Sequence, residues 1–130
     1  MSRAALALFA LMLLVSASCE FVVGAAAGAG AMYALGEDST EQFFDAPMPQ
    51  AHAAALAELT ARGEVRRDDP GAKEGVIEAS VEGSKITVSL HVMTGSTTRI
   101  VVTARKWGSL APDLDGAQML ADRIARRLSE

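Results

Sequence analysis

Cysteine is almost absent from this chain of 130 residues, in which only Cys19 carries a thiol. A single cysteine excludes a disulfide within the chain and a metal site built from several thiolates. The folded part must therefore be held together by an apolar core, and 50% of the residues are hydrophobic. The position of Cys19 is informative, because it ends a hydrophobic N-terminal run and is followed by the acidic Glu20.

Motifs that reveal chemistry are also missing from the sequence. No Gly-x-Ser-x-Gly elbow, phosphate-binding loop or His-Glu-x-x-His motif occurs. The two histidines, His52 and His91, have no further histidine, cysteine or carboxylate at the spacing of a metal site, so we interpret them as surface or boundary residues. We therefore assign no catalytic residue, cofactor or metal, and we expect that the protein is not an enzyme.

The remaining candidates for a site have ordinary structural explanations. The carboxylate pairs Asp68-Asp69 and Asp113-x-Asp115 can bind a cation, but both lie beside Pro or Gly, where Asp stabilises turns through hydrogen bonds to the backbone. Trp107 follows two cations and can mark a contact surface. We favour turns for both carboxylate pairs, and we interpret the tryptophan as a half-buried residue that closes the sheet edge.

Positive charge is in short supply, with 12 Lys and Arg against 16 Asp and Glu and a formal net charge of −4. Removing residues 1–18 takes away only Arg3, which leaves 11 basic and 16 acidic residues and a net charge of −5. Nucleic acid requires a basic face, so we expect no nucleic-acid partner. Electrostatic binding to anionic lipid is disfavoured for the same reason, and membrane attachment must come from acyl chains.

The first eighteen residues have the three-part pattern of an export signal. Residues 1–3 supply a short, positively charged start, and residues 4–15 are uncharged and strongly apolar. Such a run spans about 18 Å as a helix, against about 30 Å for the hydrocarbon core of a bilayer. Small residues follow at positions 16–18, as a signal peptidase requires. We therefore predict that residues 1–18 form a signal peptide.

Residues 15–19, Val-Ser-Ala-Ser-Cys, resemble the lipobox of bacterial lipoproteins. In that family the cysteine is diacylated and becomes the new N-terminus after cleavage. This chain departs from the family pattern at Ser16, where the family usually has leucine. The resemblance implies that Cys19 is the lipidation site and that it attaches the protein to a membrane of the bacterial cell envelope. We favour the periplasmic face of the outer membrane over the inner membrane.

Two alternatives to lipidation remain open. One is an ordinary cleaved signal peptide, which leaves Cys19 as an exposed thiol prone to intermolecular pairing in an oxidising compartment. The other is an uncleaved anchor, because residues 21–35 are also apolar. An anchor places the carboxylate of Glu20 within the membrane, which is energetically costly.

Residues 19–35 contain the candidate lipidation site and an apolar stretch rich in Gly and Ala. We interpret the stretch as a pliable tether between the lipid and the folded domain. Gly24 and Gly28 have the spacing that lets membrane helices approach closely, so a membrane-surface or self-associating segment is the alternative. A soluble linker normally carries more polar residues than this stretch has.

Residues 36–130 are expected to form one small domain, which begins with a strand and a helix. Residues 36–44 predict the first strand. The Ala-rich residues 50–62 predict a helix that ends at Gly63. The following charged segment is expected to be partly extended, with an optional short strand at residues 64–67.

A β-meander and a second helix are expected to complete the domain. Apolar and polar residues alternate with a period of two around Ile77 and again from Ile86 to Val92, and we predict a two-residue turn at Gly83-Ser84. Residues 98–107 are rich in β-branched side chains and predict the last strand. The final helix is indicated by an apolar stripe with three- and four-residue spacing, preceded by a capping box in which Asp115 is the cap. The stripe consists of Ala117, Leu120, Ile124 and Leu128.

This order of elements, β-α-β-β-β-α, predicts an α+β fold. We expect a two-layer sandwich in which an antiparallel meander of three to five strands carries two helices on one face, after an N-terminal signal helix and a Gly/Ala-rich tether. The order, the lipobox and Gly95-Ser96-Thr97-Thr98 before the last strand resemble a group of small bacterial lipoproteins. That resemblance implies a location and a fold but no activity, because the group has no agreed one.

Two functions fit these observations. The first is a lipid-anchored structural or interaction protein that binds another envelope protein through an exposed sheet edge or a polar sheet face. The residues expected on that polar face are Thr87, Ser89, His91, Arg99, Thr103 and Arg105. The alternative is a small-ligand or lipid-binding module of the periplasm, which requires a wide cleft between the helices and the sheet. The residues expected to line that cleft are Leu90, Val92, Ile100, Val102 and Leu120.

Overall fold

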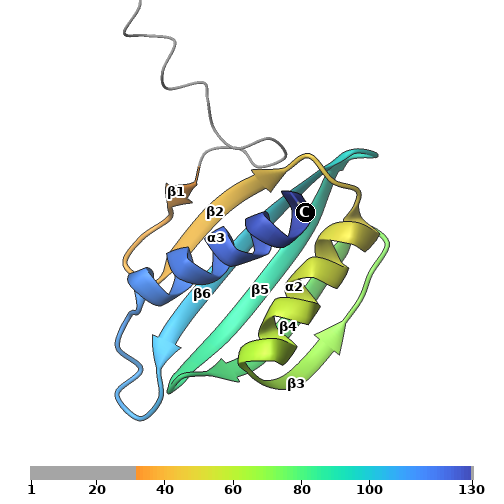
Figure 1. Ribbon diagram of the computed structural model, residues 1–130. Coiled ribbons are helices and arrows are strands. Elements are labelled where there is room, and N and C mark those ends of the chain that lie inside the picture. The colour runs from red at the N-terminus through yellow and green to blue at the C-terminus, as the bar shows by residue number, and fades with distance from the viewer. Residues whose placement is uncertain (1–31, 130) are drawn as a thin grey trace, which may run out of the picture.

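The computed structural model describes residues 32–129, and within them the chain forms two layers (Figure 1). Six antiparallel strands form one sheet in the order β1-β2-β6-β5-β4-β3, and two helices lie across one of its faces. The strands are β1 (Tyr33–Ala34), β2 (Ser39–Phe44), β3 (Gly63–Asp69), β4 (Glu74–Val81), β5 (Ser84–Thr94) and β6 (Thr97–Lys106), and the helices are α2 (Met48–Arg62) and α3 (Leu114–Ser129). The predicted α+β sandwich with both helices on one face is confirmed.

The described sheet contains one strand more than the upper number expected. The extra strand, β1, lies at the end of the stretch assigned to the tether and pairs with Thr40 and Glu41 of β2. Strand β3 is also longer than the optional strand at residues 64–67, because it pairs with β4 along its whole length. The predicted signal peptide, the lipidation site and tether residues 20–31 lie outside the described residues.

The strand order follows from the path of α2. Strands β3 to β6 form a meander, whereas β2 pairs with β6 at the opposite side of the sheet from β3. Helix α2 carries the chain from the β2 side, across one face, to the β3 edge (Figure 1). The crossing helix and α3 bury the same face of the sheet, and no element within residues 32–129 covers the other face.

Alternation of side chains along the strands places the core beneath the helices. On β4, β5 and β6 the buried side chains occupy every second position, as the period of two predicts. The largest buried side chains on these three strands are Ile77, Ile86, Val88, Leu90, Ile100 and Val102. Val92 was expected to continue the apolar row of β5, but it is 36% exposed. It lies close to the turn between β5 and β6, where neither α2 nor α3 covers the sheet.

Helix α2 packs closely on the sheet because its buried side is built largely from alanines, together with Leu59. It begins at Met48, two residues before the predicted start, because proline is tolerated in the first helical turn. Gly63 ends the helix with an extended backbone, φ −168°, and at once begins β3. A Cβ atom at this position would lie 2.0 Å from the carbonyl oxygen of Ser80. The glycine is therefore required by close approach to β4.

Two local predictions were wrong by one or two residues. The turn between β4 and β5 is made by Glu82 and Gly83, whose φ angles are 48° and 81°, so the turn lies one residue before the predicted position. The cap of α3 is Asp113, whose Oδ1 accepts the backbone N–H of Gly116 at 3.1 Å. Asp115 instead lies inside the first helical turn. The physical difference is that a cap must precede the helix, and the backbone of α3 is already helical at residue 114.

Candidate interaction surface

The uncovered face of the sheet, which we call the open face, gathers the polar side chains that the alternation predicted. Cross-strand pairing places Thr87 opposite Thr103 and His91 opposite Arg99. All six expected residues, Thr87, Ser89, His91, Arg99, Thr103 and Arg105, alternate with buried residues and therefore share this face. The sequence thus predicted correctly the face on which these six residues lie.

Ion pairs cross the open face between neighbouring strands. Arg99 of β6 donates a hydrogen bond to Glu41 of β2 at 3.1 Å, and this bond raises the pKa of Arg99 above its ordinary value. Arg105 contacts Asp38 at 2.7 Å, just before the first residue of β2. These pairs join residues more than fifty positions apart. Their geometry therefore depends on the order of the strands, which sequence spacing does not reveal.

The sharpest feature of the open face is the Trp107 corner, which consists of Trp107, Arg66 and Ser80. The indole N–H of Trp107 donates to Ser80 Oγ at 3.2 Å, and Arg66 Nε donates to the same oxygen at 2.8 Å. The guanidinium carbon of Arg66 lies 5.6 Å from the centroid of the indole ring, within cation–π range. One hydrogen bond and one ring contact thus hold an indole that is 46% exposed, and the second hydrogen bond fixes Arg66 to the same serine.

The corner differs from the expectation for Trp107 in two ways. Strand β6 lies inside the sheet, between β2 and β5, so Trp107 does not close an edge. Its cationic partner is Arg66 of β3, not one of the two cations that precede it in the chain. A register shift between Val65 and Arg67 interrupts the regular alternation of β3, and Arg66 contacts Ser80 on the open face. No sequence signal of this bulge was recognised.

The free edge of β3 is poorly suited to adding a strand from a partner. Its side chains are mostly charged and exposed, and the bulge interrupts its hydrogen-bonding pattern. Charged residues and bulges are devices that proteins use to prevent pairing at an edge. The open face is consequently a better candidate for an interaction surface than this edge.

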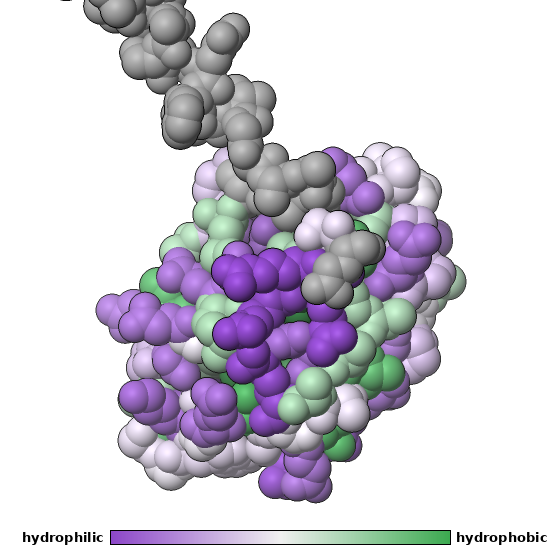
Figure 2. Space-filling model, in the orientation of Figure 1, coloured by the Kyte–Doolittle hydropathy of each residue, from purple (hydrophilic) through white to green (hydrophobic). Residues whose placement is uncertain are grey.

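A charged cluster on the opposite side of the domain has a structural role. Figure 2 views the helix-covered side and shows strongly hydrophilic side chains gathered at its centre. Glu58 of α2 accepts hydrogen bonds of 2.5 Å from Arg62 and from Arg127 of α3. Burial alone raises the pKa of the Glu58 carboxyl, but the two arginines outweigh burial and hold that pKa below its ordinary value. The cluster therefore joins the two helices.

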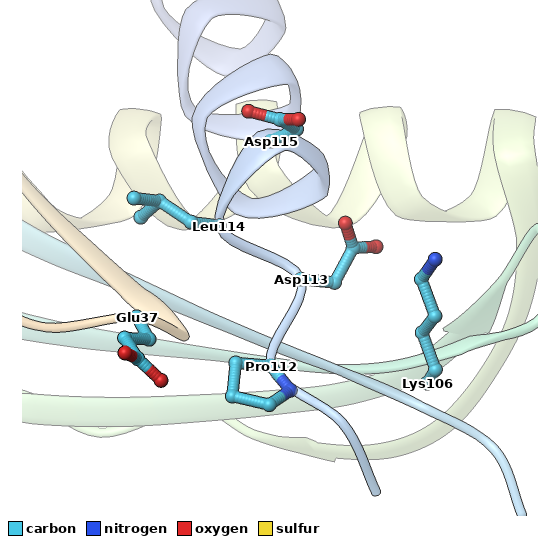
Figure 3. Close-up of a pocket in the computed structure, with 6 residues that line it drawn as sticks. All are labelled: Glu37, Lys106, Pro112, Asp113, Leu114 and Asp115. Carbon is cyan, nitrogen blue, oxygen red and sulfur yellow. The ribbon is translucent and has the colours of Figure 1, made fainter. Parts of the chain in front are cut away.

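The hollow at the start of α3 also has a structural explanation (Figure 3). Its lining includes Asp113, Asp115 and Lys106. Asp113 already caps the helix and accepts a hydrogen bond from the Ser84 hydroxyl at 2.9 Å, so its carboxylate ties α3 to β5. Among residues 32–129, no group of three or more His, Cys, Asp or Glu side chains is placed to hold a metal ion.

Each histidine contacts a carboxylate from another element. His52 of α2 lies 2.7 Å from Asp68 of β3, beside a hollow formed by the start of α2 and the loop after β3. His91 of β5 lies 3.5 Å from Glu74 of β4. Asp68 therefore belongs to a strand and contacts a side chain, whereas a turn was expected. The sequence does not predict these two histidine–carboxylate contacts, because the partners in each contact are far apart in sequence or lie on different strands.

The residues expected to line a ligand cleft are mostly core residues. Leu90, Ile100 and Val102 have no exposed surface, and Leu120 is 1% exposed. A cavity of about 50 Å³ lies beside Leu120 and Ile86, whereas small-molecule sites typically enclose about 300 to 1,000 Å³. These side chains thus pack the interior instead of forming a wide cleft.

Comparisons with known proteins identify a family without assigning an activity. In the part of the chain that the structure describes, no helix is both long and apolar enough to cross a membrane. Comparison with curated proteins finds no match. Residues 4–127 match the model of the family described as "Protein of unknown function (DUF3568)", and the chain therefore belongs to this family.

Proposed function

We propose that this protein is a bacterial cell-envelope lipoprotein, attached to a membrane through acylated Cys19, whose domain binds another envelope protein through the open face. The observation that carries the proposal is the unequal covering of the sheet. One face is buried beneath both helices, whereas the open face presents polar residues and a half-exposed tryptophan. The proposal assigns the protein no catalytic role.

Support for anchoring comes from the N-terminal sequence. A charge-free apolar run leads into the small residues before Cys19, in the pattern of the lipobox. The family match begins at residue 4, so the leader and Cys19 fall within the region that the family model covers. Acyl attachment also gives a secreted single cysteine a defined chemical fate.

Support for protein binding comes from the composition of the open face. Trp and Arg are enriched among the residues that dominate binding energy at protein interfaces, and both occur in the Trp107 corner. Because Ser80 and Arg66 already hold the indole, binding loses less side-chain entropy than it would with a freely rotating tryptophan. Neighbouring polar residues and ion pairs can then supply specificity at the rim.

Cell fractionation tests the anchoring part of the proposal. The full-length wild-type protein and Ser18→Ala, which keeps a small residue before the cysteine, should both be found in the membrane fraction. Cys19→Ala has no thiol to acylate, so the chains of this variant that have lost the leader should leave the membrane fraction. Recovery of leader-free Cys19→Ala with the membrane to the same extent as wild type would contradict lipid anchoring.

Photo-crosslinking in cells tests the interaction part. A photoreactive residue at Val101, on the open face, should give a discrete crosslinked product with an envelope protein, and the Trp107→Ala substitution should weaken it. The matched control carries the photoreactive residue at Arg123, an exposed position on the helix side. Products of equal strength from both positions, or from Arg123 alone, would exclude the open face as the binding surface.

A further inference from the structure

We propose that the β5–β6 turn faces the membrane, with Val92 and Met93 in contact with the lipid surface. This inference rests on the proposed acylation of Cys19 and adds an orientation of the domain to it. Three observations carry it: the position at which the chain enters the domain, the length of chain that precedes that position, and the unequal chemistry of the two ends of the sheet.

The chain enters the domain on the side of the β5–β6 turn. Met32 is partly buried and packs against the core, and β1 follows it directly, so the entry position is fixed. Because β1 is antiparallel to β2, Met32, directly before Tyr33, lies toward the end of β2. That end pairs with Thr98 at the beginning of β6, beside the turn (Figure 1).

The length of the preceding chain keeps the domain close to the bilayer. Residues 20–31 separate Cys19 from Met32, and they can bridge at most about 45 Å when fully extended. The eleven residues of β5 span about 37 Å at the usual rise of a strand. The reach of the tether is therefore similar to the length of the sheet, and surface chemistry decides which end turns toward the lipid.

The turn between β5 and β6 has the chemistry of a lipid-contacting end. Val92 is 36% exposed and Met93 is 52% exposed. The register shifts between Val92 and Thr94, which leaves Met93 outside the strand pairing. Residues 92–98 contain no charged side chain, so the desolvation penalty for the turn itself is small. The nearest charged residues are Lys73, whose carbonyl accepts the N–H of Val92 at 2.8 Å, and Glu74, opposite His91.

The opposite end of the sheet has a different character. Trp107 and Leu110 are exposed there too, at 46% and 54%, but they lie among the exposed cations Lys85, Arg105 and Lys106. Arg66 is engaged with Trp107. Strand β6 contains ten residues, so this end lies about 33 Å from the β5–β6 turn. With the turn at the lipid surface, the Trp107 corner points away from the membrane and is accessible to an envelope partner.

Fluorescence quenching by lipid tests this orientation, because Trp107 is the only tryptophan in the chain. The reporter variant carries Met93→Trp together with Trp107→Phe, and the wild type, with Trp107 alone, is the matched control. Both full-length lipidated proteins are reconstituted in phosphatidylcholine and phosphatidylglycerol vesicles, with or without bromine on the acyl chains. We expect brominated lipid to quench the reporter at position 93 about twofold, since interfacial side chains reach about 5 to 10 Å into the bilayer boundary.

Trp107 in the wild type should keep its emission in the same brominated vesicles. Equal quenching of both tryptophans, or quenching of Trp107 alone, would overturn the orientation. Sedimentation with the vesicles separates this inference from the proposed function. If both proteins sediment and position 93 is not quenched, the orientation is wrong and anchoring stands. If neither protein sediments, anchoring fails and the orientation fails with it.

Discussion

Ile100 and Val101 are neighbours in β6, yet they lie in different environments. Ile100 has no exposed surface and packs beneath the helices, whereas Val101 is partly exposed on the open face. The same contrast runs along β4 and β5, where buried apolar positions alternate with partly exposed ones. Packing restricts which side chains the covered face can carry, because each buried side chain there must fit its neighbours. The open face is under weaker packing constraints and can serve binding.

The largest effect is expected from substituting these two neighbours. Ile100→Ala should lower the free energy of unfolding by about 3 kcal/mol, because it leaves a cavity in the packed interior. Val101→Ala, which removes a smaller and partly exposed side chain, should cost less than about 1 kcal/mol. Urea unfolding of both variants measures the difference. Similar losses for the two substitutions would mean that the open face is also a packed face.

The next largest loss of stability is expected from breaking an ion pair, and it should differ between the helix-covered side and the open face. Glu58, with a side chain that is 7% exposed, accepts hydrogen bonds from two arginines between the helices. Glu58→Gln should lower the free energy of unfolding by about 2 kcal/mol at neutral pH, because hydrogen bonds to a charged group are lost. Glu78→Gln on the open face, where Arg67 lies 3.8 Å away and both side chains are more exposed, should cost less than about 0.5 kcal/mol.

The pH dependence of Glu58→Gln has a definite sign. Arg62 and Arg127 outweigh burial and keep the pKa of the folded Glu58 carboxyl below its unfolded value. The stabilisation is therefore complete above the unfolded pKa of about 4.3 and is lost as the pH falls through the folded pKa. Urea midpoints of wild type and Glu58→Gln should thus converge in acid. A difference that stays constant from neutral to strongly acidic pH would rule out the charged cluster as its source.

The smallest loss of stability is expected at the start of α3, where Asp113 connects the helix to the sheet. Asp113 caps α3 and also accepts a hydrogen bond from Ser84 of β5, so Asp113→Ala should cost about 1 kcal/mol. Asp115→Ala, in the first turn, should cost only a few tenths of a kcal/mol through the helix dipole. Thermal or urea unfolding distinguishes them. A larger loss of stability for Asp115→Ala than for Asp113→Ala would mean that Asp115 is the helix cap, as the sequence predicted.

Local patterns predicted the layers well, because alternation and helical spacing report directly on burial. They could not predict β1, whose two residues are ordered by pairing with β2. They also placed Val92 in the core, since alternation continues past the point where the helices end. The contacts of the Trp107 corner depend on a bulge and on strand order, neither of which has a signal in residue spacing.

The proposed attachment through Cys19 is tested most directly by the intact mass of the mature protein purified from membranes. We expect a chain that begins at Cys19 and carries the additional mass of covalently bound acyl chains. Mass spectrometry of the N-terminal peptide should place that mass on the cysteine. A mature chain that begins at another residue, or one that begins at Cys19 without acyl mass, would contradict lipid attachment at Cys19.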